Sequence, residues 1–368
     1  MMARAAMAEA DTAGVARLDL IEGWPAPEGR ADWFGDLGAE RVLLDAYRGG
    51  RMHHAWLIGG PKGIGKATLA YRLTRFVLAH PDHRAAAVAT ATDLSVAADH
   101  PAFRKVAARA HPNLLVLERP YDEKYHRYKS ELPVDEIRRT VSFFGSTSGE
   151  PGWRIAIVDP ADDMNASSAN ALLKVLEEPP RRSLFLVVSH APGRTLATIR
   201  SRCRRLDLKP LSLEAIADAI GGKVEADAAD VALAAVLAEG SLRRAILLVE
   251  GGGIDIHRRL AQILSRLPEV DIAAMHRLAE RVSRRGDDDA WNGFRDILAG
   301  WLNRRVRGEK EPDSGVPPAP AVLATPLERW AEVWENLRHS SALADALNLD
   351  RNRTVLSILM SLARATRM

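Results

Sequence analysis

Residues 59–68 of the chain, GGPKGIGKAT, have the composition and spacing of a phosphate-binding loop. Gly60, Gly65 and Lys66 fit the pattern G-x-x-x-x-G-K, and Gly63 adds a third glycine between them. Glycines let backbone N–H groups turn toward phosphate oxygens, and the N-terminus of a following helix adds partial positive charge. Lys66 would then reach the β- and γ-phosphates of a nucleoside triphosphate. The alternative is a glycine-rich turn that binds no ligand.

Two residue types that triphosphate hydrolysis requires are missing from this sequence. Ala67 follows Lys66 at the position where a Ser or Thr hydroxyl normally binds Mg²⁺, and Thr68 points about 100° away if the segment is helical. Asp159 ends an apolar run and suits the acid near the metal, but Pro160 stands where an ATPase has a Glu that polarises water. We therefore predict a P-loop fold with at most weak ATP or ADP binding and no turnover.

Arg202, in the segment Ser201-Arg202-Cys203, is the candidate for chemistry outside this phosphate site. It follows a second apolar run and lies among several arginines. An arginine at a subunit edge can stabilise charge on a neighbour's γ-phosphate, which is the arginine-finger role. The alternative is a solvated arginine in a basic surface cluster. We expect Cys203 to pack in the core.

Three strands are expected to position these residues. Residues 55–58 form a short apolar run just before the glycine loop. Residues 155–158 and 184–188 are continuous apolar runs, rich in β-branched residues, that end at Asp159 and Ser189. Such runs are typical of strands buried on both faces of a parallel sheet. A parallel sheet would bring the ends of these strands to one edge.

Two helices are predicted around the strands. One spans residues 132–144 and has an apolar face made of Val134, Ile137, Val141 and Phe144. The other begins at Asp163 or Asn165, either of which can cap a helix, and stops before Pro179-Pro180.

The bulk properties allow two or three domains in 368 residues. A formal charge of +3 is too small to indicate nucleic acid binding by itself. A single cysteine excludes an internal disulfide and suits a reducing cytoplasm. No apolar run approaches the roughly 20 residues that span a bilayer, so we expect no membrane partner. Residues 1–30 are predicted to be a disordered tail without a signal peptide.

Four histidines, His80, His83, His100 and His111, are scattered over a region that carries no cysteine. A metal site is conceivable there. Their spacing is not that of paired metal ligands, so we expect solvated histidines and no zinc.

Several segments together resemble the AAA+ clamp-loader family of bacterial DNA polymerase III. The matching segments are HHAWLIGGPKGIGKATLA, HPNLLVLE, RIAIVDPADDMN, SANALLKVLEEPP, TIRSRCRRL, GSLRRAI and ALNLDRNRT. They run through nearly the whole chain beyond the tail. The combination of ANALLK-x-LEEPP with SRC is far more specific than a P-loop alone.

The resemblance implies an α/β fold: an AAA+ P-loop domain with a parallel sheet over residues 31–210, a small helical lid over 211–253, and an all-α collar that oligomerises over 254–368. Gly251-Gly252-Gly253 is the predicted joint between lid and collar. In this family the cofactor-binding set would be Gly60, Gly63, Gly65, Lys66, Ala67, Thr68, Asp159, Ser189 and Arg243. Ser189 matches the sensor-1 position and Arg243 the sensor-2 position.

The resemblance also implies a role in DNA replication. Motor subunits of the family bind ATP, and an adjacent subunit inserts the arginine of its SRC segment into the site. Arg202 has that position, and Ala67 and Pro160 fit a non-motor member that is neither polymerase nor ATPase by itself. The implied partners are gamma/tau-type ATPase subunits, the delta subunit, the sliding clamp, and primer-template DNA through the complex. The family's usual four-cysteine zinc module is absent.

Two other functions remain open at this point. The chain could be an active gamma/tau-type ATPase, which would bind nucleotide with Mg²⁺ in isolation. It could also be an unrelated P-loop NTPase or kinase, which would need a phosphate-acceptor pocket and would leave the SRC segment without a purpose.

Overall fold

The computed structural model describes residues 20–124, 127–145, 152–284, 286–309 and 317–367. The chain divides into two compact units, Met1–Leu211 and Ser212–Met368. Among the described residues, no helix is both long enough and apolar enough to cross a membrane.

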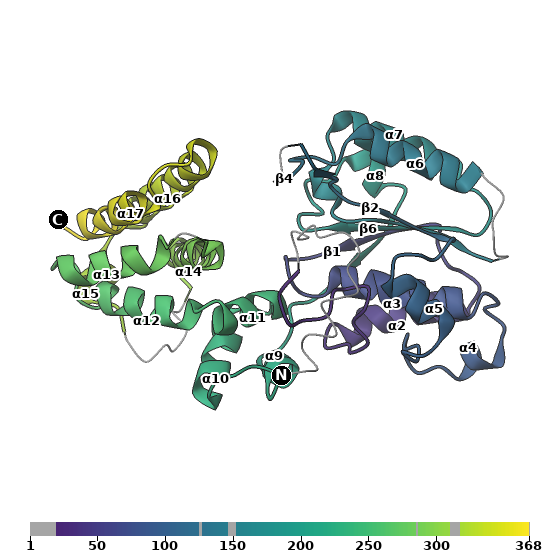
Figure 1. Ribbon diagram of the computed structural model, residues 1–368, viewed down its shortest axis with the longest axis horizontal. Helices are drawn as coiled ribbons and strands as arrows, with labels where there is room; N and C mark the ends of the chain where they lie inside the picture. The colour runs from purple at the N-terminus through teal and green to yellow at the C-terminus, as the bar shows by residue number, and fades with distance from the viewer. Residues whose placement is uncertain (1–19, 125–126, 146–151, 285, 310–316, 368) are drawn as a thin grey trace. The chain divides into compact units, whose positions relative to one another are not determined.

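The first unit is built on a parallel sheet of five strands in the order β2-β5-β6-β1-β7 (Figure 1). The strands are β1 (Ala55–Gly59), β2 (Leu114–Leu117), β5 (Arg154–Val158), β6 (Ser183–Ser189) and β7 (Arg204–Asp207). Every residue of β1 and β6 is buried, as their unbroken apolar sequences predict. A separate two-stranded hairpin pairs β3 (Tyr121–Asp122) with β4 (Arg127–Tyr128).

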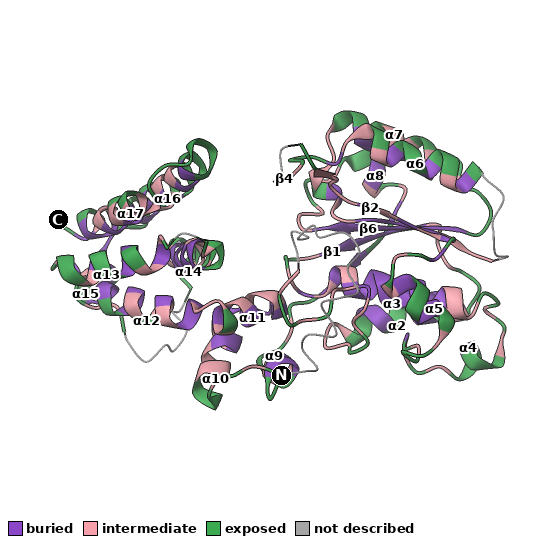
Figure 2. Ribbon diagram, viewed as in Figure 1, coloured by how far each residue is buried: buried purple, intermediate pink, exposed green. Residues whose placement is uncertain are grey.

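Helices cover both faces of this sheet, whose central strands are buried (Figure 2). Alternate strand residues pack against each face. Trp56 and Ile58 of β1 face one layer, whereas Ala55 and Leu57 face the other. The first layer is α2 (Leu37–Arg48), α3 (Lys66–Ala79), α4 (Ala86–Thr90) and α5 (Pro101–Ala107). The second is α6 (Val134–Gly145), α7 (Ala166–Glu177) and α8 (Ala197–Arg200). The α/β expectation is confirmed.

Helix α6 agrees with its prediction in extent but not in its whole apolar face. Ile137 and Phe144 are buried, but Val141 is 61% exposed. The cap of α7 is Asn165, whose side chain accepts from the N–H of Ser168 at 3.0 Å. Asp163, the other candidate, forms an ion pair with Arg119.

The predicted disordered tail is wrong over residues 28–30. Glu28 is only 4% exposed. Arg75 donates to the carbonyl oxygens of Glu28 (2.9 Å) and Arg30 (2.7 Å), and Arg109 forms an ion pair with the Glu28 carboxylate at 2.9 Å. These arginines lie at least 45 residues further along the chain, so the local sequence gives no sign of them. Residues 1–19 of the predicted tail lie outside the described residues.

The second unit is helical throughout its described residues. Its helices are α9 (Leu213–Ile220), α10 (Ala228–Leu237), α11 (Leu242–Glu250), α12 (Gly253–Leu264), α13 (Ile272–Val282), α14 (Asp288–Arg307), α15 (Pro320–Ala324), α16 (Leu327–Leu347) and α17 (Arg351–Ala365). Helix α11 packs against both α12 and α14. Glu239, just before α11, accepts hydrogen bonds from Arg244 and from Arg304 of α14. The division of this unit into lid and collar at Gly251–Gly253 stays a prediction.

Candidate nucleotide site and arginine segment

The glycine loop joins β1 to α3 in a backbone conformation that side chains would disturb. Gly60, Gly63 and Gly65 have φ of +137°, +82° and +95°. A Cβ on Gly60 would lie 3.0 Å from the carbonyl oxygen of Leu208, and one on Gly65 would lie 3.1 Å from the Trp33 ring. At both positions a side chain would crowd neighbouring atoms and would also disfavour the positive φ, so both residues have to be glycine.

Lys66 is the first residue of α3 and is 3% exposed. Its ammonium donates to the carbonyl oxygens of Gly60 (2.7 Å) and Pro61 (2.5 Å), so the side chain folds back over its own loop. Burial lowers the pKa of Lys66 to about 8, although Asp159 and Asp162 oppose that shift. Lys66 at the glycine loop therefore lies close enough to Asp159 and Asp162 for their charges to interact.

The positions that would hold Mg²⁺ and activate water carry no suitable group. Ala67 has no hydroxyl, and the hydroxyl-bearing Thr68 is buried. Asp159 follows the last residue of β5, as predicted, and Pro160 follows it without an acid. Hydrolysis needs a positioned base together with metal-bound phosphate.

Asp162 is a further acid of this site that its local sequence does not single out. Its carboxylate accepts from the Ser189 hydroxyl at 3.0 Å, from the His190 N–H at 2.6 Å and from the Ala191 N–H at 3.0 Å. Ser189, the predicted sensor-1 residue, is fully buried at the end of β6. Three donors fix the Asp162 carboxylate, so it organises the segment after β6 rather than serving as a mobile base.

Arg202 lies just after α8 and is held by two elements. Its Nη2 donates to Oε1 of Glu177, at the end of α7, at 2.7 Å, and its Nη1 donates to the carbonyl oxygen of Thr198 at 3.0 Å. The side chain is 34% exposed. The neighbouring Cys203 is buried in the core below, as predicted, and burial raises the pKa of its thiol to about 12. The Arg202 guanidinium is thus held by two hydrogen bonds while part of the side chain remains accessible to solvent.

Arg243 is placed on α11 of the second unit, apart in the chain from the other site residues. Its assignment as a sensor-2 arginine therefore stays a prediction.

The sequence predicts that the four histidines are solvated, but this does not hold for all of them. His111 is 5% exposed, and its Nδ1 accepts from the N–H of Asn113 at 3.1 Å. His100 caps α5 by accepting from the N–H of Ala102. Within the described ranges, no three His, Cys, Asp or Glu side chains are grouped as metal ligands.

A phosphate-type loop after β1, an acid after β5, a polar residue after β6 and this strand order together define a P-loop domain of the AAA+ class. Residues 38–212 match the model of a family described as DNA polymerase III, delta subunit. This part of the chain is therefore similar to the delta-subunit family of DNA polymerase III.

Curated relatives agree with this placement. The chain is 38% identical over 157 residues to DNA polymerase III subunit delta' of Pseudomonas aeruginosa, covering 42% of this chain and 43% of that protein. It is 30% identical over 226 residues to subunit delta' of Escherichia coli, covering 61% of this chain and 62% of that protein. The matches thus span roughly half the length of these relatives. A DNA polymerase III gamma subunit-related protein of Thermotoga maritima is similar over 88% of this chain and 99% of its own, at 14% identity and a TM-score of 0.41.

Proposed function

We propose that this chain is a delta-prime-type clamp-loader subunit that does not hydrolyse ATP and supplies Arg202 to the ATP site of a neighbouring subunit. In this role it acts as a stator, helping to load a sliding clamp on primed DNA in the cytoplasm. The proposed partners are gamma/tau-type ATPase subunits, the delta subunit, the clamp and, through the complex, primer-template DNA. We propose that no cofactor is required.

The observation that carries the proposal is the attachment of Arg202. Its guanidinium is bonded to a carboxylate and a carbonyl at 2.7 Å and 3.0 Å and remains partly exposed. A guanidinium has five N–H donors in a planar fork, and it binds carboxylate and phosphate in similar geometry. A γ-phosphate presented by a neighbouring subunit could therefore share this guanidinium with Glu177 or replace it.

The character of the chain's own phosphate site supports the non-hydrolysing half of the proposal. Lys66 is bonded to loop carbonyls. Ala67 offers no metal ligand and Pro160 no base, while Asp162 is engaged by three donors. Weak ATP or ADP binding without turnover fits this set of residues.

The alternative with a specific observation behind it is an active gamma/tau-type ATPase. The glycine loop and Lys66 are intact, and the chain is also 28% identical over 230 residues to DNA polymerase III subunit tau of Escherichia coli. An unrelated P-loop kinase or NTPase would not account for these relatives.

Phosphate release from the isolated chain separates the two roles. The purified protein is incubated with Mg-ATP, and Lys66→Ala serves as the control for contaminating activity. We expect wild type and Lys66→Ala to release phosphate at the same background rate. Magnesium-dependent release that Lys66→Ala abolishes would assign the chain to the motor subunits instead.

A further inference from the structure

A pocket of about 640 Å³ opens in the first unit beside the amino ends of the strands, whereas the glycine loop lies at the carboxyl end of β1. Three segments that each lead into a strand line it: Met52 precedes β1, Trp153 precedes β5, and Arg182 precedes β6. The glycine loop leaves β1 at the other end. The pocket is therefore separate from the phosphate site. Arg202 precedes β7 at the same end of the sheet but does not line the pocket. The pocket volume is within the roughly 300–1,000 Å³ of small-molecule sites.

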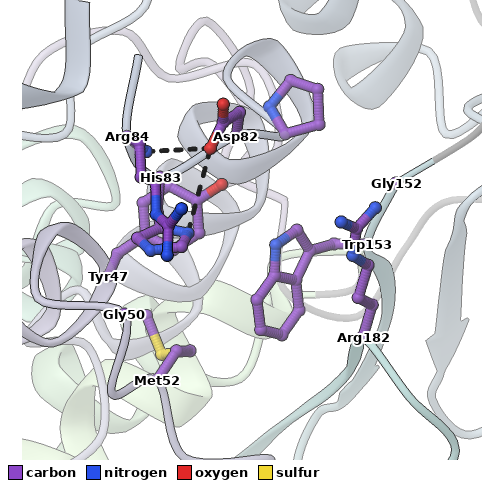
Figure 3. Close-up of a pocket in the computed structure, with 10 residues that line it drawn as sticks. Tyr47, Gly50, Met52, Asp82, His83, Arg84, Gly152, Trp153 and Arg182 are labelled. Atoms are coloured by element: carbon purple, nitrogen blue, oxygen red, sulfur yellow. Dashed lines mark hydrogen bonds and ion pairs between the residues drawn. The ribbon is translucent and has the colours of Figure 1, made fainter. Parts of the chain in front are cut away.

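Aromatic rings form the inner surface of the pocket (Figure 3). Tyr47 is 1% exposed and forms the floor, with its hydroxyl donating to the carbonyl oxygen of His80. The rings of Trp153 and His83 lie 6.0 Å and 6.5 Å from the Tyr47 ring, both edge to face. Trp153 and His83 are only partly buried, so flat ring surface remains available to a ligand.

Positive charge predominates at the rim. Besides His83, the charged lining residues are Arg84, Arg182 and Asp82. Asp82 is engaged locally: its Oδ1 accepts from the Arg84 N–H at 3.0 Å and lies 4.0 Å from Nδ1 of His83. The guanidinium groups of Arg84 and Arg182 come from opposite walls (Figure 3).

The backbone of the pocket is shaped at two left-handed positions. Arg182 has φ of +55°, which is uncommon for a residue with a side chain. Gly50 has φ of +63°, and a Cβ there would meet Nε2 of His83 at 2.8 Å. The glycine at position 50 therefore leaves room for the His83 ring.

We propose that this pocket binds a nucleotide unit, with its base against Trp153 and His83 and its phosphate between Arg84 and Arg182. Aromatic side chains bind bases by stacking, with little sequence preference, and arginines contribute phosphate contacts. The unit could be a free nucleotide or part of a single strand, because both present the same chemistry. An apolar peptide fits less well because charged and ring surfaces dominate the lining.

The test measures binding in a Lys66→Ala background, which removes the contribution of the phosphate loop. The probes are dTMP, a ten-residue oligo-dT, inorganic phosphate and a short polyglutamate peptide, each followed by calorimetry. Arg182→Gly is the central variant because glycine tolerates a positive φ and the fold should be retained. Arg181→Ala is the matched control, an exposed neighbour that does not line the pocket.

We expect dTMP or oligo-dT to bind, and Arg182→Gly to weaken that binding by about tenfold while Arg181→Ala leaves it unchanged. In Arg182→Gly, the slope of log K against log[salt] for oligo-dT binding should become shallower by roughly the value of one phosphate contact. A higher affinity for oligo-dT than for dTMP identifies a strand as the source, and a higher affinity for dTMP identifies the free nucleotide.

Four results would overturn the proposal: no nucleotide binding in the Lys66→Ala protein, equal binding by Arg182→Gly, equal binding of inorganic phosphate, or polyglutamate binding without nucleotide binding. None of these results bears on Arg202, so the proposed clamp-loader role would be unaffected.

Discussion

Arg202 and Glu177 are joined by a 2.7 Å hydrogen bond that ties the arginine segment to the last turn of α7. The two residues are 25 positions apart in the chain. The pair is partly exposed, with side chains 34% and 51% accessible. Its contribution to stability is therefore small, and its value lies in directing the guanidinium.

Glu177→Ala is expected to lower the ATPase rate of a reconstituted complex by roughly 3- to 30-fold, because a misdirected guanidinium stabilises the transition state less well. Glu177→Gln keeps an acceptor and should be intermediate. The free energy of unfolding of the chain should change by less than about 1 kcal/mol in either variant.

Glu178→Ala is the matched control for Glu177, since Glu178 is the adjacent exposed acid and Glu177 is the one bonded to Arg202. If Glu177→Ala and Glu178→Ala were equally active, Glu177 would have no part in positioning the arginine.

Lys66→Ala should change the ATPase rate of the same complex by less than about twofold, because this site lacks the metal ligand and base that turnover needs. The assay compares steady-state phosphate release with wild-type and variant subunit at equal assembly. If the rate fell as far as it does when the phosphate-loop lysine of a motor subunit is replaced, the chain's own site would hydrolyse ATP.

The buried Lys66 also predicts a pH dependence of stability. Its pKa is about 8 in the folded chain, against 10.5 for an ordinary lysine. Between these values the unfolded chain holds a proton that the folded chain has released, so the free energy of unfolding rises with pH. Between pH 8 and pH 10.5, the free energy of unfolding of wild type should rise by up to about 3 kcal/mol relative to that of Lys66→Met. Urea denaturation measures this difference. A difference that stays flat would mean that the ammonium is solvated.

Asp162→Asn should destabilise the first unit by about 1 kcal/mol, because the amide can accept at only one atom and turns N–H groups toward the donors. Two backbone N–H groups and the Ser189 hydroxyl now meet that carboxylate. The measurement is chemical denaturation, with Asp218→Asn as an exposed control on α9. Equal stability of the two variants would argue against a structural role for Asp162.

Much of the first unit could be predicted because its signals are local. The glycine loop, the buried strands ending at Asp159 and Ser189, and the cap at Asn165 each depend on neighbouring residues. Helical periodicity located α6 but could not reveal that Val141 lies beyond the covered face. Whether Val141 is covered depends on how far the helix overlaps the sheet.

The missed features all depend on long-range partners. Asp162 gains its role from residues 27 to 29 positions later. Glu28 is fixed by arginines 47 and 81 positions away. Two adjacent acids after Asp159 were the available signal for Asp162, but only the fold shows which one turns toward β6.

The most direct test of the account is the ATPase rate of a reconstituted clamp-loader complex that carries Arg202→Ala. Arg205→Ala is the control, because Arg205 is an exposed arginine of the same segment that pairs with Asp207. We predict that Arg202→Ala assembles normally but slows turnover at the neighbouring site by up to about 10³–10⁵-fold, as loss of an arginine finger does. A complex with Arg202→Ala that hydrolyses ATP as fast as the Arg205→Ala complex would contradict the account.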